Sequence, residues 1–321
     1  MAASPPLILR LVASSVMIAN QAGKIIRDVM TKGELNIVYK GDKSKNDFQT
    51  EADRSAETCI ISSLAALFPA ITIIGEEARE SGHSQEQCDV PPEWIIKDMD
   101  QAVLGKQCPS SLESLVEKDI VVWVDPLDGT QEYTQGFLDH VTVLIGISAH
   151  GKALAGVIHQ PFYNYKAKES DPNSPLGRTI WGIQDLGVGG YTPQAPPADK
   201  RIITTTRSHN TSVVQAVLDA MKPDEVIRVG GAGNKVLLVM EGKAHAYVYA
   251  NAGCKRWDTC APEAILNAQG GFLTDVHGQP YDYSATVEPL NKGGVIASAK
   301  KEEHDYYISR ISQEIKDKLV S

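Results

Sequence analysis

The feature that most constrains the fold is a short apolar run that ends abruptly at a charged turn. Residues 120–124 read Ile-Val-Val-Trp-Val, and Asp-Pro-Leu-Asp-Gly-Thr follows directly at residues 125–130. β-Branched and aromatic residues without polar interruption predict a β-strand. Because open α/β sheets present ligands at the carboxyl ends of their strands, the turn after this strand is a candidate site.

The residues of this turn suit a rigid, ligand-facing geometry. Pro126 restricts the backbone, so we expect the carboxylate of Asp128 to lie beside that of Asp125. Gly129 lets the backbone approach a ligand closely. Thr130 stands where a helix can begin, and the free N–H groups of a helix start suit a phosphate.

Two carboxylates on one turn favour a Mg²⁺ site, because hard cations prefer oxygen ligands. The carbonyl of Leu127 is a further candidate ligand. The alternative is a solvated Asp-Gly turn that caps a helix, since Asp-Gly is a common turn pair. An EF-hand loop is excluded because its alternating ligand pattern is missing.

Three more acidic residues lie at predicted element ends. Glu76 follows an apolar run and could join the same metals, or it could belong to an exposed acidic turn. Asp53 lies three residues after Thr50, which predicts a capping box as readily as a carboxylate that helps to activate water. Asp258 follows Trp257 and either caps the next helix or ligates a metal.

Strands and helices alternate along much of the chain, which predicts an α/β protein with sheets layered between helices. Polar residues at 78–118 predict a surface excursion, and residues 161–176 resemble a loop. We expect two lobes, residues 1–170 and 171–321, with their boundary near 165–178. The predicted helices are 8–30, 50–67, 211–221, 233–241, 258–268 and a last one from 302. The predicted strands are 71–74, 120–124, 141–147, 153–160, 179–183, 202–205, 226–229, 246–249, 271–275 and 294–297.

The charge balance narrows the class of ligand. The 321 residues include 31 basic and 40 acidic side chains, a formal charge of −9. A nucleic-acid polymer requires a cationic face, so we expect no such partner. A small phosphorylated ligand remains compatible, because metal ions held by carboxylates supply local positive charge.

Cysteine use and hydrophobicity favour a cytoplasmic protein without a membrane anchor. The number of cysteines is odd, and no pair has the spacing of a zinc or redox motif, so we expect reduced thiols. The first predicted helix is amphipathic and interrupted by polar residues, which is not typical of a signal peptide. The cysteines are Cys59, Cys88, Cys108, Cys254 and Cys260.

Together these segments resemble the inositol monophosphatase/fructose-1,6-bisphosphatase superfamily of Mg²⁺-dependent, Li⁺-inhibited phosphatases. The resemblance covers nearly the whole chain, from Asp53 to the segment at 270–275. Within the superfamily, three segments are similar to the bisphosphate nucleotidase branch: Glu132-Tyr133, residues 204–209 and residues 229–235. The inositol monophosphatase branch typically has Asn-Phe in place of Glu132-Tyr133.

The resemblance implies a five-layered αβαβα sandwich and a site with two or three Mg²⁺ ions, at which Li⁺ inhibits. It implies Asp53 and Thr130 as the catalytic pair that positions and deprotonates water. It implies a small bisphosphate substrate and no obligate protein partner. The implied metal ligands are Glu76, Asp125, the Leu127 carbonyl, Asp128 and Asp258, and the implied substrate contacts are Gly129, Thr206, His209, Gly231 and Lys235.

Three functions stay open at this point. The first is removal of the 3′-phosphate from adenosine 3′,5′-bisphosphate, and from its sulfated precursor. The second is an inositol polyphosphate 1-phosphatase, and the third is a catalytically silent, metal-dependent binding protein. The segments 41–45 and 78–118 are longer than the superfamily pattern, which affects loop geometry but no proposed ligand.

Overall fold

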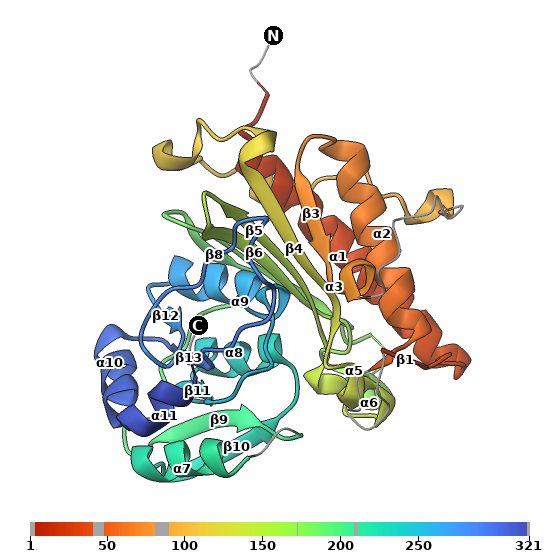
Figure 1. Cartoon of the computed structure of the whole chain (residues 1–321). Helices are drawn as coiled ribbons and strands as arrows, with labels where there is room; N and C mark the ends of the chain where they lie inside the picture. Colours follow the sequence, from red (N-terminus) through yellow and green to blue (C-terminus); the bar gives the residue numbers. More distant parts are fainter. Residues whose placement is uncertain (1–3, 41–47, 81–89, 172, 209–210, 320–321) are drawn as a thin grey trace.

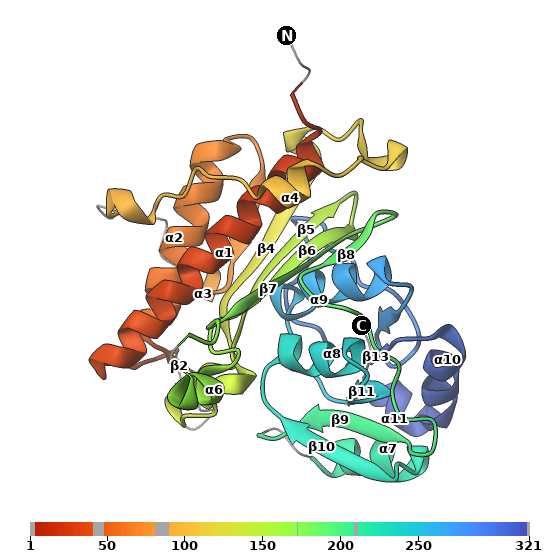
Figure 2. The same ribbon diagram turned by 180° about the vertical axis from the view of Figure 1, so that it is seen from behind.

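The computed structural model describes residues 4–40, 48–80, 90–171, 173–208 and 211–319, and the structural statements below concern these ranges. Within them, helices and sheets alternate in five layers (Figures 1 and 2). This arrangement confirms the αβαβα sandwich. The layers are α1 (Leu7–Lys32) with α2 (Glu51–Leu67), a six-stranded sheet, α8 (Ala232–Met240) with α9 (Arg256–Ala268), a five-stranded sheet, and α7 (Ser212–Met221) with α10 (Lys301–Arg310).

The first sheet sets the position of the acidic turn. Its strand order is β3-β4-β5-β6-β7-β8, and β3 and β4 are parallel whereas the other pairs are antiparallel. The carboxyl ends of β3 and β4 therefore lie at the same edge of the sheet. The strands are β3 (Thr72–Gly75), β4 (Ile120–Asp128), β5 (Thr142–Ala149), β6 (Lys152–Gln160), β7 (Arg178–Ile183) and β8 (Gly187–Gly189).

The second sheet has the order β10-β9-β11-β13-β12. Its strands β9, β10 and β11 are mutually parallel, so the loops that follow them also meet at one edge. The strands are β9 (Ile202–Thr206), β10 (Glu225–Val229), β11 (Ala246–Tyr249), β12 (Phe272–Thr274) and β13 (Val295–Ser298).

Short elements connect these layers. Strands β1 (Val38–Tyr39) and β2 (Phe48–Gln49) pair as a small antiparallel ribbon. The short helices are α3 (Glu76–Glu80), α4 (Gln101–Leu104), α5 (Thr130–Thr134), α6 (Tyr165–Ser170) and α11 (Gln313–Lys318), with single 3₁₀ turns at Pro92–Trp94, Ser110–Leu112, Glu117–Asp119 and Leu138–His140.

A row of glycines brings α9 close to the first sheet. Gly146, Gly156 and Gly182 are register partners on the neighbouring strands β5, β6 and β7. A Cβ atom on any of them would lie less than 3.0 Å from atoms of α9, and on Gly156 it would lie 2.5 Å from the carbonyl oxygen of Ala261. The row therefore lets the helix backbone rest directly on the sheet, which fixes the position of the first turn of α9.

Gly156→Ala should lower the free energy of unfolding by about 1–3 kcal/mol, because the added methyl group overpacks a closed helix–sheet contact. Urea unfolding followed by circular dichroism measures this change. Gly105→Ala is the comparison, because its added Cβ makes a milder contact, 3.3 Å from the Gln101 carbonyl oxygen against 2.5 Å at Gly156. Equal stability of the two variants would show that α9 can move away from the sheet without cost.

A buried acid on α9 makes stability depend on pH. Glu263 is 6% exposed and accepts a hydrogen bond of 2.6 Å from the Tyr283 hydroxyl. Burial, above all, raises the pKa of Glu263 from 4.5 to about 8. The unfolded chain loses this proton near pH 4.5, whereas the folded chain keeps it until the pH approaches 8. The contribution to stability is therefore complete below the lower value and decreases as the pH rises to the upper one.

Glu263→Gln should remove this dependence, because glutamine stays neutral at every pH. Relative to the unchanged chain, the variant should gain stability between about pH 4.5 and 8, by a few kcal/mol over the whole interval. Denaturant unfolding at several pH values tests this. Parallel stability curves for the two proteins would contradict the raised pKa.

The middle of the chain differs in part from the sequence expectation. Residues 161–176 were expected to be a loop, and this is wrong in part, because α6 occupies Tyr165–Ser170. Its described residues are mostly exposed, so no apolar periodicity marked it. The division into lobes at residue 170 stays a prediction. Strands β7 and β8 follow that boundary yet belong to the first sheet, and the change of sheet falls between β8 and β9.

We find no helix in the described ranges with both the length and the apolar character that a bilayer crossing requires.

Candidate active site

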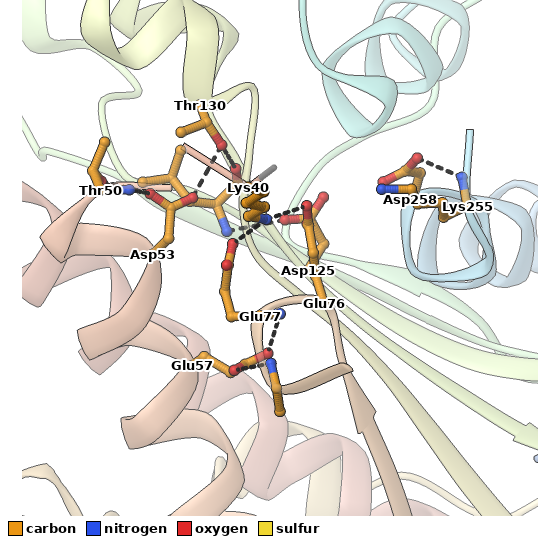
Figure 3. A network of polar contacts seen from close by, with 12 residues as sticks. Lys40, Thr50, Asp53, Glu57, Glu76, Glu77, Asp125, Thr130, Lys255 and Asp258 are labelled. Carbon is orange, nitrogen blue, oxygen red and sulfur yellow. Dashed lines mark hydrogen bonds and ion pairs between the residues drawn. The ribbon is translucent and has the colours of Figure 1, made fainter. Parts of the chain in front are cut away.

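Four segments bring acidic side chains to one edge of the first sheet (Figure 3). Glu76 follows β3, and Asp125 and Asp128 lie in the last part of β4. Asp53 lies in the first turn of α2, and Asp258 lies in the first turn of α9. The parallel pairing of β3 with β4 accounts for the first three, because it places both strand ends together. The sequence prediction of a shared acidic site therefore has a structural basis in this sheet.

Asp128 joins the turn after β4 to helix α8. Its Oδ1 accepts a hydrogen bond of 2.8 Å from the N–H of Ala232, and its Oδ2 accepts bonds of 2.8 Å from the N–H of Gly233 and 2.6 Å from the Thr142 hydroxyl. These bonds fix the carboxylate and cap the helix. The first N–H groups of α8 therefore donate hydrogen bonds to Asp128.

Asp125 is held within its own turn. It is 2% exposed, and its Oδ1 accepts a hydrogen bond of 3.0 Å from the N–H of Leu127. The pairing of β4 with β5 is irregular between Asp125 and Asp128, which bends the strand end. The carbonyl of Leu127 accepts a bond of 3.1 Å from the Thr130 hydroxyl.

Asp53 forms the predicted capping box and also contacts Thr130. Its Oδ2 accepts a hydrogen bond of 2.7 Å from the Thr50 N–H, which completes a capping box. Its Oδ1 accepts a bond of 3.0 Å from the hydroxyl of Thr130. Burial raises the pKa of Asp53, although the hydrogen bonds from Thr50 oppose this shift. One carboxylate therefore both starts α2 and contacts the predicted catalytic threonine.

A lysine stands among these carboxylates. The Nζ atom of Lys40 lies 2.9 Å from Oε1 of Glu76 and 2.7 Å from Oε1 of Glu77, and the lysine side chain is only 8% exposed. Beneath them, Glu57 accepts hydrogen bonds of 2.9 Å from the N–H groups of Glu77 and Ala78 (Figure 3). Burial above all raises the pKa of Glu57 to about 7. Glu57 thus anchors the turn that carries Glu76.

Asp258 lies on α9, in the third layer of the fold. Its Oδ2 accepts a hydrogen bond of 2.7 Å from the N–H of Lys255, which starts helix α9. Burial, and then the charges of Glu76 and Asp128, raise the pKa of Asp258 to about 7. The capping and ligand interpretations of Asp258 are therefore compatible, because capping uses one oxygen.

The negative charges of the clustered carboxylates favour the binding of cations. Burial raises the pKa of Asp125 well above its usual range, and the charges of Glu76, Asp128 and Asp258 add to the shift. Carboxylates this close repel one another unless positive charge lies among them. In the described ranges, no three His, Cys, Asp or Glu side chains are arranged to hold an ion as they stand. The donors are nevertheless carboxylate and carbonyl oxygens, which fit a hard divalent cation in chemistry and charge.

A cavity of about 370 Å³ opens beside the cluster. Its walls come from the acidic edge of the first sheet and from the loops after β9, β10 and β11. The predicted substrate contacts Gly129, Thr206, Gly231 and Lys235 line it, together with Glu76, Asp128, Thr130 and Asp258. His209 lies outside the described residues.

Lys235 is the buried cation of this cavity. It lies on α8 and is 5% exposed, and its Nζ lies 5.2 Å from the centre of the Tyr247 ring. Burial lowers the pKa of Lys235, and the charge of Asp128 opposes this effect. An ammonium in this position suits a phosphate group of a ligand, because a second anion offsets the cost of burying the cation.

Sequence reasoning did not identify Lys40 or Glu57. Lys40 belongs to no recognisable motif, and it directly follows β1, which pairs with β2. Glu57 did have a signal, because it lies four residues after Asp53 and thus on the same face of α2.

Comparisons with known proteins identify the relatives of this chain. A profile of the inositol monophosphatase family matches residues 9–316. The human 3′(2′),5′-bisphosphate nucleotidase 1 (Homo sapiens) is 51% identical over 320 residues, and the rat protein of that name (Rattus norvegicus) is 50% identical, each over 100% of both chains. The crystal structure of the extragenic suppressor protein suhB from Bartonella henselae has a TM-score of 0.66 at 20% identity, and it covers 94% of this chain and 98% of its own. This chain belongs to the inositol monophosphatase family.

Proposed function

We propose that this protein is a Mg²⁺-dependent phosphomonoesterase that removes the 3′-phosphate of adenosine 3′,5′-bisphosphate and leaves AMP. The observation that carries the proposal is the identity of about half of all residues, over the full length, with bisphosphate nucleotidases. The cavity beside the acidic cluster supports the proposal, because Asp128, Asp258 and the buried Lys235 all line it. The sulfated precursor of the same nucleotide is a second proposed substrate.

We infer that two or three Mg²⁺ ions bind at the cluster and that Li⁺ inhibits there. The proposed ligands are Glu76, Asp125, the Leu127 carbonyl, Asp128 and Asp258. When bound, the metals lower the pKa of a water molecule, neutralise the phosphoryl group and stabilise the leaving oxygen. The support is the all-oxygen donor set and the repulsion among its buried charges. Lys40 supplies part of the compensating charge.

The role proposed for Asp53 and Thr130 is to take a proton from the attacking water. The Thr130 hydroxyl donates to Oδ1 of Asp53, so its oxygen can accept a hydrogen bond from water and pass the proton to that carboxylate. Burial raises the pKa of Asp53 and makes it a better base than an exposed aspartate. We expect water to attack the phosphorus atom directly and in line, so the reaction requires no phosphoenzyme.

The rest of the cavity orients the substrate. Gly129 and Gly231 have φ angles of 93° and 72°, which favour glycine, and both line the cavity. Thr206 lies at the end of β9 on the opposite wall. The ammonium of Lys235 is proposed to contact the phosphate that is not removed. We expect a soluble cytoplasmic enzyme without an obligate partner.

Lys235→Met should weaken binding of adenosine 3′,5′-bisphosphate by about 10- to 100-fold, because a charge-assisted contact with phosphate is lost. Hydrolysis of a substrate with one phosphate should change far less. The measurement is KM for both kinds of substrate. Lys243→Met, on an exposed lysine just after the same helix, is the control. A similar loss for both substrates would contradict a role at the second phosphate.

The proposal is tested by phosphate release from adenosine 3′,5′-bisphosphate and inositol 1,4-bisphosphate, measured in parallel. Each assay is run with Mg²⁺, with a chelator, and with Mg²⁺ plus Li⁺. We expect metal-dependent, Li⁺-inhibited release that favours the nucleotide. A preference for the inositol compound would contradict the nucleotide assignment and favour the polyphosphate 1-phosphatase. Binding without any turnover would favour a silent binding protein.

A further inference from the structure

A partly buried ion pair joins the two sheets at the rim of the cavity. Glu132 lies on α5, just after the acidic turn, and is 3% exposed. Its Oε1 lies 3.3 Å from Nε and 3.2 Å from a terminal nitrogen of Arg207, which follows β9 of the second sheet. A further bond of 2.5 Å connects Arg207 to the side chain of Gln135. The two halves of the cavity are thus linked by one guanidinium group.

The guanidinium is also fixed by packing. It lies over the ring of Phe137 at 4.3 Å from the ring centre. That ring is in turn stacked on His140, with centres 5.8 Å apart and planes 12° apart. A cation over an aromatic face gains electrostatic attraction as well as contact. Arg207 is therefore held by charge, hydrogen bonds and an aromatic face at once, which leaves it little freedom.

Arg207 lies between two residues of the cavity wall. Thr206 and Ser208 line the cavity, whereas Arg207 between them is not part of its wall. Thr206 is the last residue of β9, and Arg207 and Ser208 form a bend directly after it. The N–H of Arg207 continues the strand pairing by donating to the carbonyl of Val229 at 3.2 Å. The contacts of Arg207 therefore fix the backbone between two residues that line the cavity.

The loop after β10 is shaped to fit Glu132. A Cβ atom on Gly230 would lie 1.9 Å from Cδ of Glu132, so only glycine leaves room for this carboxylate. The N–H of Gly230 donates to Nδ1 of His140 at 3.3 Å. The next residue, Gly231, lines the cavity. Glu132 therefore contacts both loops of the second sheet that bear proposed nucleotide contacts.

From these contacts we propose that Glu132 and Arg207 are positioning residues for nucleotide specificity, and we name the pair the rim latch. The rim latch holds the β9 and β10 loops against the acidic turn, so that Thr206, Ser208 and Gly231 form a preshaped wall for the nucleoside. The inference rests on the proposed function. It predicts that loss of the pair weakens nucleotide binding, because the loops must then be ordered by the ligand itself. The chemical step at the acidic edge stays nearly unchanged.

The test is a double-mutant cycle with Glu132→Gln, Arg207→Met and the double variant, on adenosine 3′,5′-bisphosphate. Glu132→Gln should raise KM about tenfold, the scale of one charge-assisted hydrogen bond, with kcat nearly unchanged. Arg207→Met should raise KM further, because it leaves a buried negative charge at the rim of a phosphate site. The double variant should return to the KM of Glu132→Gln. Arg207→Lys should restore part of the affinity lost in Arg207→Met.

Two further measurements separate positioning from a general loss of structure. Calorimetry should show weaker AMP binding in step with KM, whereas inhibition by inorganic phosphate should not change. Lys166→Met is the control, because it breaks an exposed pair, in which Lys166 lies 2.9 Å from Asp139, in the same region. The melting temperature of each variant shows that it is folded, and Arg207→Lys provides the test if Glu132→Gln does not fold.

Additive losses in the cycle, or a fall in kcat with KM unchanged, would overturn the rim latch while the proposed function stands. Equal weakening of AMP and inorganic phosphate would overturn it in the same way. An unchanged protein that neither binds AMP nor hydrolyses the nucleotide would overturn the proposed function, and the rim latch with it.

Discussion

Asp128→Asn should lower kcat by about a thousandfold or more, because a metal site supplies several kcal/mol of transition-state stabilisation. The substitution removes a charge from the cluster but keeps the shape of the side chain. Its amide oxygen can still accept one of the bonds that now come from Ala232 and Gly233. Alanine is a poorer test, because it would remove the cap of α8 and the bond from Thr142 together.

A readout independent of activity accompanies this variant. A ligand that binds only the folded state raises stability as its concentration exceeds Kd, so Mg²⁺ should raise the melting temperature of the unchanged protein. That rise should be largely lost in Asp128→Asn. Asp139→Asn, which removes an exposed carboxylate paired with Lys166, should keep both activity and the Mg²⁺ effect. Normal turnover by Asp128→Asn would show that the metals bind elsewhere.

Asp53→Asn should lower kcat by about 10²- to 10⁴-fold, the usual contribution of a positioned general base. An amide has only one acceptor oxygen, so it cannot accept from both the Thr50 N–H and the Thr130 hydroxyl as the carboxylate does. If the oxygen keeps the capping bond, the amide nitrogen faces Thr130 and cannot take a proton. The effect should appear in kcat, with KM and the Mg²⁺-induced rise in melting temperature largely retained.

The control for this variant lies two residues earlier on the same helix. Glu51→Gln neutralises a side chain that is 43% exposed and paired with Arg54, at the surface of the same first turn of α2. It should have nearly normal kcat, whereas the loss in Asp53→Asn should be large. If Asp53→Asn instead lost the Mg²⁺ effect, Asp53 would act as a metal ligand and the proposed division of roles would be wrong.

Much of the fold could be predicted because its strongest elements are locally consistent. Strand β11 lies at Ala246–Tyr249, the predicted range, and β4 contains the predicted strand at residues 120–124. The apolar patterns there match the burial of the strands. The prediction was incomplete where elements are short or polar. Helix α6 and strand β8 have few buried residues, so the chain gives little pattern from which to infer them.

The candidate site was predictable where a motif carries it and not where tertiary packing does. Glu76 follows β3 and Asp128 is the last residue of β4, and parallel pairing brings these strand ends together. The approach of α9 depends on a row of glycines on three separate strands, which no local pattern reveals. The contact of Lys40 with Glu76 joins residues that are far apart in the chain. The same holds for the rim latch.

The double roles at the site have a common physical cause. Asp53, Asp128 and Asp258 each accept hydrogen bonds at the first turn of a helix and also lie in the acidic cluster. A helix start offers N–H groups and positive potential, which stabilise a buried carboxylate. The fold thus holds carboxylates that repel one another, at positions where each is stabilised by a different helix.

The central claim is most directly tested by identifying the products of adenosine 3′,5′-bisphosphate hydrolysis in ¹⁸O-labelled water with Mg²⁺ present. Removal of the 3′-phosphate by direct water attack predicts unlabelled AMP that retains its 5′-phosphate, and inorganic phosphate with one ¹⁸O atom per turnover. Release of the 5′-phosphate, label in the nucleoside hydroxyl, or no turnover in the presence of Mg²⁺ would contradict the account.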